Sequence, residues 1–317
     1  MSEKIKIYGV VGATASGKTA LAIELAKRID GEIICCDSMQ IYKEMNIGTA
    51  KPTEEERAAA THHMTDFLPP EAPYSCADYV KDAEAIVEDI VARGKKPIFC
   101  GGTGLYLDRF LRGGNSDEAA SDPLYREELT EISMTEGGID KLHEMLSELD
   151  PESACAIHKN NVKRVIRALE IIKSTGRKKS EVDKDNSEFS DRYEPCIIYP
   201  FYQNRDILYG RIERRVDMMI EAGLVEETKR LYDAGVFKVS STAAQAIGYK
   251  ELLPYIEGAD TLENCIERLK AATRKYAKRQ NTWFSGKTYC QKIMMDDENG
   301  IKTFEEIVNI SEKYFIN

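Results

Sequence analysis

What most constrains this chain is a loop with the phosphate-binding pattern G-x-x-x-x-G-K-[ST], formed by Gly12-Ala13-Thr14-Ala15-Ser16-Gly17-Lys18-Thr19. A strand-like run, Ile5 to Val11, precedes the loop, and a helix-like run, Ala20 to Ile29, follows it. Glycines let the backbone turn tightly, so successive N–H groups and the positive end of the helix can point at one anion. Lys18 would add a positive charge, and the Thr19 hydroxyl is a candidate Mg²⁺ ligand. The loop therefore predicts a di- or triphosphate site rather than an ordinary turn.

Polar residues follow two further strand-like runs. A P-loop enzyme that transfers a phosphoryl group usually has an apolar strand ending in a Mg²⁺-binding Asp. Here the run Pro97–Cys100 continues into Gly101-Gly102-Thr103-Gly104 and has no carboxylate at its end. The carboxylate instead follows the run Gly31–Cys36, at Asp37. Because the carboxyl ends of parallel strands open on one crevice, Asp37 and Thr103 should both face the phosphate site. These residues alone leave open whether a phosphoryl group is transferred or a diphosphate departs intact.

The charge distribution bears on whether the chain could bind nucleic acid without selectivity or only through a defined RNA footprint. A net charge of −10 over 317 residues argues against a protein that coats nucleic acid without selectivity. Two segments are nevertheless basic, and each alone could equally be a solvated helix face. Together, in an acidic chain, they favour a defined RNA footprint. Their basic residues are Lys159, Lys163, Arg164, Arg167, Lys173, Arg177, Lys178 and Lys179 in one segment, and Arg268, Lys270, Arg274, Lys275, Lys278 and Arg279 in the other.

Cysteine and histidine usage gives little sign of a metal or disulfide framework. The eight cysteines are scattered with no C-x-x-C pair, so we expect reduced thiols. His62 and His63 precede Asp66, but no second Cys/His cluster accompanies them, so metal binding there is not expected. No signal peptide or membrane-spanning run is visible, and we expect a cytoplasmic protein with no membrane partner.

The order of predicted elements indicates an α/β fold: a P-loop doubly wound parallel sheet core with a helical insertion domain. Residues 1–114 alternate between strand-like and helix-like runs and form the first part of the core. Residues 115–192 begin within the break Gly113–Asp117, are helical from Pro123 to Thr175, and form the insertion, which we expect to contact RNA. A loop is expected from Gly176 to Asp191. Residues 193–317 return to the core, first with a strand at Cys196–Tyr199 and then with helices.

At this point the chain resembles a known family, the tRNA dimethylallyltransferases (tRNA isopentenyltransferases). The resemblance rests on an ordered set of motifs that runs from near the N-terminus to beyond residue 280, which is far more specific than the P-loop alone. Besides the P-loop, the motifs are Asp37–Tyr42, Asn46–Pro52, Gly101–Tyr106, Arg164–Glu170, Gln245–Glu251 and Thr273–Phe284. After Trp283-Phe284 the family usually has Arg, whereas this chain has Ser285, so a phosphate contact could be missing or shifted to Lys287.

The resemblance implies transfer of a dimethylallyl group from dimethylallyl diphosphate to N6 of the adenine on the 3′ side of the tRNA anticodon, with Mg²⁺ as cofactor. We expect a monomer whose partners are the prenyl diphosphate and the anticodon stem-loop. Lys18, Asp37 and Thr103 are the expected catalytic residues. Asp37 would accept a proton from the amine, although an N-cap or turn role is the alternative. Thr103 would hydrogen-bond the diphosphate or, alternatively, cap the next helix.

The resemblance also assigns tRNA contacts. Gln40 could read the adenine edge, and Trp283 could stack on a base, although a single Trp is as often a core residue. Arg167 could instead pair with Glu170 on its own helix. The full expected set is Asp37, Ser38, Met39, Gln40, Thr103, Arg126, Asn161, Val162, Lys163, Arg164, Val165, Gln245, Gly248, Lys278, Arg279, Gln280 and Trp283.

Two other functions compete with this interpretation. A P-loop kinase for a small metabolite would use ATP, but it leaves the basic segments and the carboxylate-free Gly101–Gly104 turn unexplained. A nucleotide-switched binding module would need a guanine-reading N/T-K-x-D signature, and none is evident. The transferase therefore accounts for more of the chain.

Overall fold

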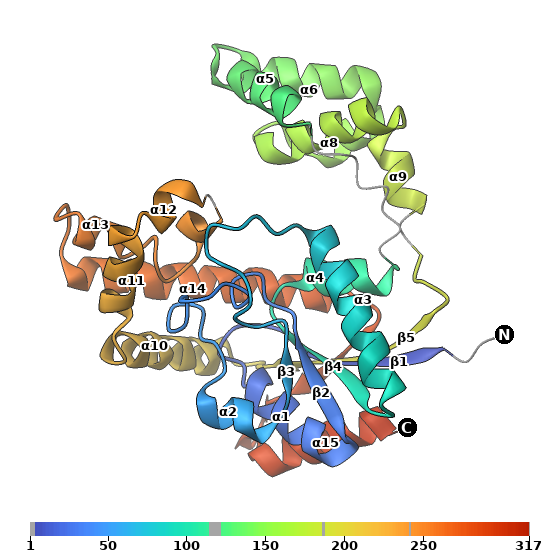
Figure 1. Cartoon of the computed structure of the whole chain (residues 1–317), viewed down its shortest axis with the longest axis vertical. Helices are drawn as coiled ribbons and strands as arrows, with labels where there is room; N and C mark the ends of the chain where they lie inside the picture. The colour runs from blue at the N-terminus through green and yellow to red at the C-terminus, as the bar shows by residue number, and fades with distance from the viewer. Residues whose placement is uncertain (1–3, 114–121, 186–187, 241, 317) are drawn as a thin grey trace. The chain divides into compact units, whose positions relative to one another are not determined.

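A computed structural model describes residues 4–113, 122–185, 188–240 and 242–316 (Figure 1). These residues form two compact units, residues 1–110 with 191–317, and residues 111–190. The end of the predicted break, Gly114 to Asp117, lies outside the described residues. Among the described helices, none combines the length and apolar character needed to cross a bilayer.

The larger unit is built on a six-stranded sheet in the order β3-β2-β4-β1-β5-β6. Every pairing in it is parallel, as predicted for a doubly wound core. The strand expected after the insertion is present as β5 and pairs with β1. The strands are β1 (Ile5–Val11), β2 (Gly31–Cys35), β3 (His62–His63), β4 (Lys96–Gly101), β5 (Tyr193–Phe201) and β6 (Cys290–Met294), and a small hairpin adds β7 (Asp296–Asp297) and β8 (Gly300–Ile301).

Helices cover both faces of this sheet (Figure 1). Neighbouring residues of a strand point to opposite faces, and β4 shows the consequence. Ile98 belongs to the core formed with α1 and α15, whereas Phe99 packs on Phe110 of α4 with ring centroids 4.6 Å apart. The helices around the sheet are α1 (Lys18–Ile29), α2 (Glu54–Ala59), α3 (Cys76–Ala92), α4 (Gly104–Leu111) and α15 (Phe304–Ile316).

A second hydrophobic core in the same unit joins residues 39–47 to the helices after β5. Tyr42 and Tyr249 are its largest fully buried side chains. These helices are α10 (Arg205–Glu221), α11 (Leu224–Asp233), α12 (Val236–Val239), the 3₁₀ turn Ala243–Gln245, α13 (Leu253–Ile256) and α14 (Leu262–Ser285). The core fixes the segment after Asp37 against helices that lie about 200 residues later in the sequence.

The smaller unit is helical, and its core comes from Leu129, Leu142, Leu146, Val165 and Leu169. Its helices are α5 (Pro123–Met134), α6 (Gly138–Leu149), α7 (Pro151–Ala156), α8 (Val162–Thr175) and α9 (Lys179–Asp185). The last of these corrects the prediction of a loop from Gly176 to Asp191.

This error has a clear physical origin. The segment is too short and polar to show helical periodicity, yet α9 is anchored by Asp150 of the preceding α6–α7 junction. The buried Asp150 carboxylate accepts hydrogen bonds from the Ser180 N–H at 2.8 Å and the Ser180 hydroxyl at 2.8 Å, as well as from Ser153. Burial opposes ionisation, but these four donors outweigh it and lower the pKa of Asp150 to about 2.

We therefore expect Asp150→Ala to destabilise the insertion by about 1–3 kcal/mol, because it strands buried donors. The pKa is lowered in the folded state, so this contribution is complete above the ordinary aspartate pKa and is lost as the pH falls toward 2. Urea unfolding of Asp150→Ala at pH 7 and pH 3 measures both effects. Asp183→Ala, which removes a more exposed carboxylate of α9, is the control. Equal stability of the two variants would contradict the anchoring role.

Candidate active site at the carboxyl ends of the strands

Three loops meet where β1, β4 and β2 end. The N–H of Gly12 donates to the Gly101 carbonyl at 3.2 Å, and the N–H of Cys36 donates to the Cys100 carbonyl at 2.8 Å. The N–H of Thr103 then donates to the Cys36 carbonyl at 3.0 Å. The P-loop, the Asp37 turn and the Gly101–Gly104 turn are thus joined through their backbones. We call this place the strand-end site.

The P-loop has the backbone that its glycines permit. Gly12 and Gly17 have φ of +131° and +92°, and α1 begins directly after Gly17. The Ser16 hydroxyl is buried and has no hydrogen-bond partner among the described residues, which suits an oxygen of a bound anion. The Thr14 N–H, however, donates to the Gln280 side chain at 2.9 Å. This donor is used within the protein, so the anion-facing part of the predicted loop is smaller than Gly12–Thr19.

Three positive side chains surround the P-loop. Lys18 donates to the Ala13 carbonyl at 3.4 Å, and burial, with the charge of Arg215, lowers its pKa. Arg211 and Arg215 lie one turn apart on α10. Arg211 donates to the Ala15 carbonyl at 2.8 Å, and Arg215 lies 3.4 Å from the Thr14 hydroxyl. Burial lowers the pKa of Arg215 as well. Clustered like charges with few acidic partners favour binding of an anion.

Asp37 lies two residues beyond the end of β2, beside the loops described above. Its Oδ1 accepts a hydrogen bond from the Met39 N–H at 3.0 Å, so the predicted turn role is present. Burial raises the pKa of the carboxyl above its usual range, although the Met39 N–H and Lys18 favour the ionised form. A carboxylate of raised pKa is a stronger base. The turn geometry and a proton-accepting role are therefore compatible.

Thr103 faces the Asp37 turn. Its hydroxyl oxygen accepts a hydrogen bond from the Ser38 N–H at 3.0 Å and lies 3.4 Å from the Ser38 hydroxyl. Tyr276 of α14 lies near this turn, and burial together with the nearby charge of Asp37 raises the pKa of Tyr276. Thr103 thus helps to hold the carboxylate turn through Ser38.

Gln40, which we expected to read the edge of adenine, binds backbone carbonyls of the protein instead. Its side-chain amide donates to the Thr49 and Ala50 carbonyls, both at 3.1 Å. Bidentate reading of adenine would require breaking these bonds. Gln40 therefore ties the Asp37 turn to the loop that follows it.

The loop at residues 46–51 is held from its other side by Glu227 of α11. This carboxylate is 2 % exposed and accepts hydrogen bonds from the N–H groups of Asn46, Ile47 and Gly48 at 2.9–3.2 Å, and from the Tyr249 hydroxyl at 2.8 Å. Gly248 packs against the same loop, since a Cβ at Gly248 would lie 3.1 Å from the Gly48 carbonyl oxygen. The motifs around residues 46–52 and 245–251 are thus partly structural.

The donor set suits Mg²⁺ only in combination with a phosphate ligand. No cluster of three His, Cys, Asp or Glu side chains within the described ranges could hold a metal by itself. Mg²⁺ usually takes one or two protein oxygens and fills its shell with phosphate oxygens and water. Thr19, in the first turn of α1 directly after the P-loop glycine Gly17 and Lys18, could provide such an oxygen. His63 instead contacts Glu32 at 2.7 Å, in an ion-pair cluster away from this loop.

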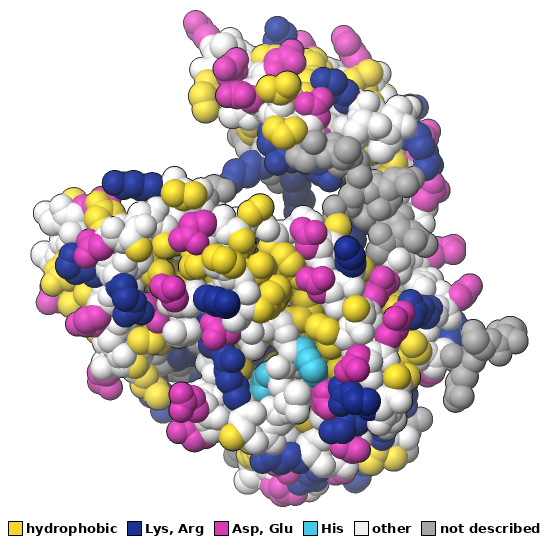
Figure 2. Space-filling view, viewed as in Figure 1, with side chains coloured by type: hydrophobic (Ala, Val, Ile, Leu, Met, Phe, Trp, Pro, Cys, Tyr) yellow, Lys and Arg dark blue, Asp and Glu magenta, His cyan; other side chains and the backbone are white. Residues whose placement is uncertain are grey.

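The RNA candidates on α14 divide into exposed and buried groups. Lys278 and Arg279 are exposed, as is Gln245 before α13. Gln280 is buried, with 5 % exposure. Trp283 is 36 % exposed, although it also packs on Gly104 and has Lys287 4.6 Å above its ring. Arg274 pairs with Glu213 at 2.6 Å, and Lys287 pairs with Asp108 at 2.8 Å. Figure 2 shows basic and acidic side chains interleaved on the visible face of the core.

The candidates on the insertion divide in the same way. Asn161, Lys163 and Arg164 are exposed at the start of α8, and Val162 is half-buried. Val165 is fully buried in the core of the insertion, so its side chain is not available to RNA, contrary to expectation. Arg126 of α5 binds Glu170 through two hydrogen bonds of 2.9 Å.

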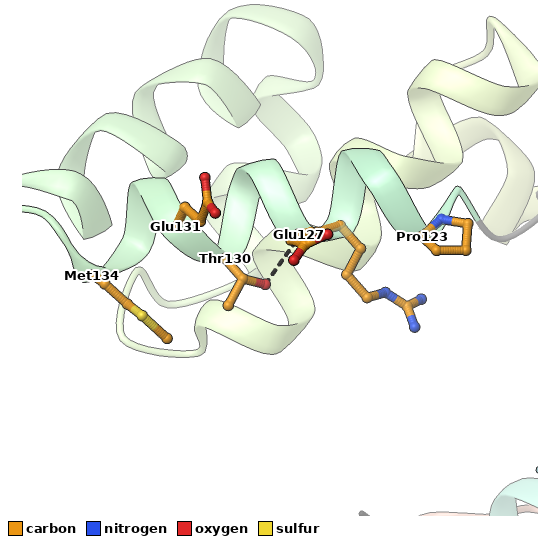
Figure 3. Close-up of a pocket in the computed structure, with 6 residues that line it drawn as sticks. Pro123, Glu127, Thr130, Glu131 and Met134 are labelled. Carbon is orange, nitrogen blue, oxygen red and sulfur yellow. Dashed lines mark hydrogen bonds between the residues drawn. The ribbon is translucent and has the colours of Figure 1, made fainter.

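Arg167 also lies 3.7 Å from Glu170, so the predicted pairing on its own helix is present. The 1 % exposed Glu170 carboxylate thus holds two arginines. Beside Arg126, one side of α5 carries Glu127, Thr130, Glu131 and Met134, and Figure 3 shows these residues lining an open pocket with Pro123. Two of them are acidic, so this face does not extend the basic set.

Comparison with known proteins identifies the relatives of this site. The model of the IPP transferase family matches residues 40–287, and that of isopentenyl transferase matches residues 5–64. A tRNA dimethylallyltransferase of Halalkalibacterium halodurans is 44% identical over 96% of both chains, and one of Bacillus cytotoxicus is 45% identical over 98% of this chain and 96% of its own. The chain belongs to the tRNA dimethylallyltransferase family.

Solved structures agree with this membership of the family. A tRNA isopentenylpyrophosphate transferase of Bacillus halodurans has a TM-score of 0.72 and 40% identity, covering 99% of this chain and 96% of its own. A eukaryotic dimethylallyltransferase captured acting on tRNA has a TM-score of 0.75 and 34% identity, covering 89% and 70%. The predicted family, fold and prenyltransferase class are confirmed, and the small-molecule kinase finds no support among these relatives.

Sequence reasoning missed several residues of the strand-end site. Arg211 and Arg215 lie in a helix with mixed charges, and nothing local marks them as neighbours of the P-loop. Tyr276 was part of a motif but received no role. Their positions depend on how α10 and α14 pack against strands that are distant in sequence. Only the i, i+4 spacing of two arginines on one helix could have indicated a shared target.

We expect Arg215→Met to weaken inhibition by inorganic pyrophosphate by roughly 10- to 100-fold, because it removes a partly desolvated, charge-assisted contact to the anion. Folding stability should change little, since Arg215 forms no ion pair within the described part of the chain. Arg214→Met is the matched control, because Arg214 is exposed on the same helix and bonds only to its own turn at Gly210. Equal pyrophosphate inhibition of the wild type, Arg215→Met and Arg214→Met would show that Arg215 does not contribute to the anion site.

Proposed function

We propose that this chain transfers the dimethylallyl group of dimethylallyl diphosphate to N6 of the adenine on the 3′ side of the tRNA anticodon, releasing diphosphate. The observation that carries the proposal is the strand-end site. There a P-loop with three cations lies beside a carboxylate of raised pKa, and β4 contributes a Gly-Gly-Thr-Gly turn with no acidic residue. Such a site can hold a leaving anion next to a base.

The reaction breaks a carbon–oxygen bond, so negative charge grows on the departing diphosphate. Lys18, Arg215 and the free N–H groups at the start of α1 are the groups of this chain that would stabilise this charge. The Ser16 hydroxyl would add a hydrogen bond. Mg²⁺, when bound at Thr19, would supply further positive charge to the diphosphate.

The exocyclic amine of adenine must lose a proton as it forms the new carbon–nitrogen bond. Asp37 is the acceptor we assign, since burial raises the pKa of its carboxyl and it follows the strand next to β4 at the same edge of the sheet as the P-loop. Thr103, whose hydroxyl accepts a hydrogen bond from the Ser38 N–H, would position the turn or bind a diphosphate oxygen. The adenine has to leave its stack to reach this carboxylate.

Each unit contributes its own residues to the proposed RNA contacts. On the core these are Ser38, Met39, Gln245, Lys278, Arg279 and Trp283, and on the insertion, residues 115–192, they are Arg126 and Asn161 to Arg164. The insertion would thus serve the anticodon arm rather than the chemistry. We further propose that the protein acts as a monomer in the cytoplasm, where its tRNA substrate is made.

Two labelled donors distinguish the proposal from the kinase. The protein is incubated with unmodified tRNA and either dimethylallyl diphosphate labelled in the prenyl group or γ-labelled ATP. The proposal expects prenyl label in tRNA, at the adenine next to the anticodon, and no label from ATP. Labelled phosphate on any acceptor, without prenyl transfer, would refute it.

We expect Asp37→Asn to cut turnover by on the order of 10²-fold or more while leaving pyrophosphate and tRNA binding nearly intact. In the wild type, kcat/KM should rise with pH as Asp37 loses its proton. Because burial raises the pKa of Asp37, this limb should lie above the range of an ordinary aspartate. The limb should vanish in the variant. Unchanged turnover with weaker tRNA binding would make Asp37 a binding residue instead.

The exposed cations give a graded prediction. Lys278→Gln and Arg164→Gln should each weaken tRNA binding and lower the slope of log K against log salt by roughly one unit or less. Arg274→Gln should change the slope less, because Glu213 already neutralises that guanidinium. Titrating tRNA at several salt concentrations, with thermal melts as a check on folding, measures all three. An unaltered slope for Lys278→Gln and Arg164→Gln would remove them from the footprint.

A further inference from the structure

Gln280 is a polar residue on the buried side of a helix. Ala277, Gln280 and Phe284 follow a helical spacing and are all buried, whereas Lys278 and Arg279 are exposed between them. An apolar side chain would fill such a position at lower cost, because a buried amide loses its hydration unless it finds partners. The 5 % exposure of Gln280 also leaves no room for the RNA contact expected from the sequence.

The amide of Gln280 uses both of its ends within the strand-end site. Its Oε1 accepts a hydrogen bond from the Thr14 N–H at 2.9 Å, and its Nε2 donates to the Gly102 carbonyl at 3.0 Å. Gly102 has to be glycine for this contact, because a Cβ there would overlap the Gln280 Nε2. One side chain from α14 thus links the P-loop to the turn that carries Thr103.

The contact at Thr14 has a consequence for Lys18. The peptide unit that carries the Thr14 N–H also carries the Ala13 carbonyl, and it is planar. That carbonyl accepts hydrogen bonds from the Lys18 ammonium and the Ser16 N–H, each at 3.4 Å. Fixing one edge of the peptide therefore fixes the oxygen on its other edge. Gln280 thereby sets the orientation of the Ala13 carbonyl, which accepts the hydrogen bond of the Lys18 ammonium.

We infer that Gln280 is a positioning residue that sets the distance and orientation of the diphosphate cradle relative to the Thr103 turn and the Asp37 base. The inference rests on the proposed function, in which the leaving group and the base act on one prenyl carbon. Without the link, the Ala13–Thr14 peptide can rotate and the two loops can separate. Small errors of placement lower the rate of such a reaction far more than they lower substrate affinity.

Two substitutions break the link from opposite sides. Gln280→Met keeps the length of the side chain and removes both hydrogen bonds. Gly102→Ala leaves Gln280 in place but pushes its amide away. We expect each to lower kcat by roughly 10- to 100-fold and to weaken pyrophosphate inhibition several-fold, with the dissociation constant for tRNA within about twofold of the wild type. The kcat of the double variant should be no lower than that of the less active single variant, because both substitutions remove the same link.

Gln280→Glu provides a test by rescue. The ionised carboxylate can accept from Thr14 but repels the Gly102 carbonyl, whereas the protonated acid can make both contacts. Its kcat relative to the wild type should therefore rise as the pH falls, and burial should bring this rise into an accessible range. Gln291→Met is the matched control, since Gln291 is an exposed glutamine whose side-chain amide, among the described residues, donates to the adjacent Lys292 carbonyl.

The outcomes separate the possible roles. Weaker tRNA binding with unchanged pyrophosphate inhibition would make Gln280 an RNA contact and overturn the inference. A lower melting temperature with unchanged kcat and pyrophosphate inhibition would make it structural only and overturn it as well. Pyrophosphate and tRNA binding are measured without turnover. If the wild type transferred no prenyl group, the proposed function would fail, and a loss of pyrophosphate binding in Gln280→Met and Gly102→Ala would still establish the link.

Discussion

β4 lies between β1 and β2 and pairs with both in parallel, and this arrangement brings together the three loops of the strand-end site. The P-loop leaves β1, the Asp37 turn leaves β2, and the Gly101–Gly104 turn leaves β4 between them. Parallel strands end at the same edge of a sheet, so the three loops meet although nearly 90 residues separate the first from the last. Antiparallel pairing at either position would have placed an anion site and a base at opposite edges.

The closeness of these loops determines which residues they can contain. A Cβ at Gly101 would overlap the Cys36 carbonyl oxygen, so the end of β4 has to be glycine. A carboxylate at this point, as in phosphoryl-transferring P-loop enzymes, would also repel the diphosphate that leaves. The acid instead follows β2, one strand further from the P-loop. In the proposed reaction, the site would thus separate the group that departs from the group that accepts a proton.

Local patterns predicted the parts of this site that local chemistry determines. The P-loop, Asp37 and Thr103 could be found because each lies at a strand end marked by glycine or by a single acid. Residues that reach the site through packing could not be found. Gln280 meets Thr14 across 266 positions and Arg215 meets it across 201, and neither has a local signal. The polar α9 was missed for the same reason, since Asp150 anchors it from 30 positions away.

The distinction between local sequence patterns and contacts made by packing also applies to the charged residues. Counting lysines and arginines located two basic segments, but five of their members have acidic partners in the structure, namely Arg167, Lys173, Arg268, Lys270 and Arg274. A paired cation offers less to a phosphate, because binding must first compete with its carboxylate. In the proposed RNA footprint, the cations that Glu170 and Glu213 neutralise would therefore contribute less than their number suggests. The proposed contacts would then rest on a few cations that form no ion pair among the described residues, such as Arg164 and Lys278, rather than on a broad basic surface, and such a footprint would favour one shape of RNA over RNA in general.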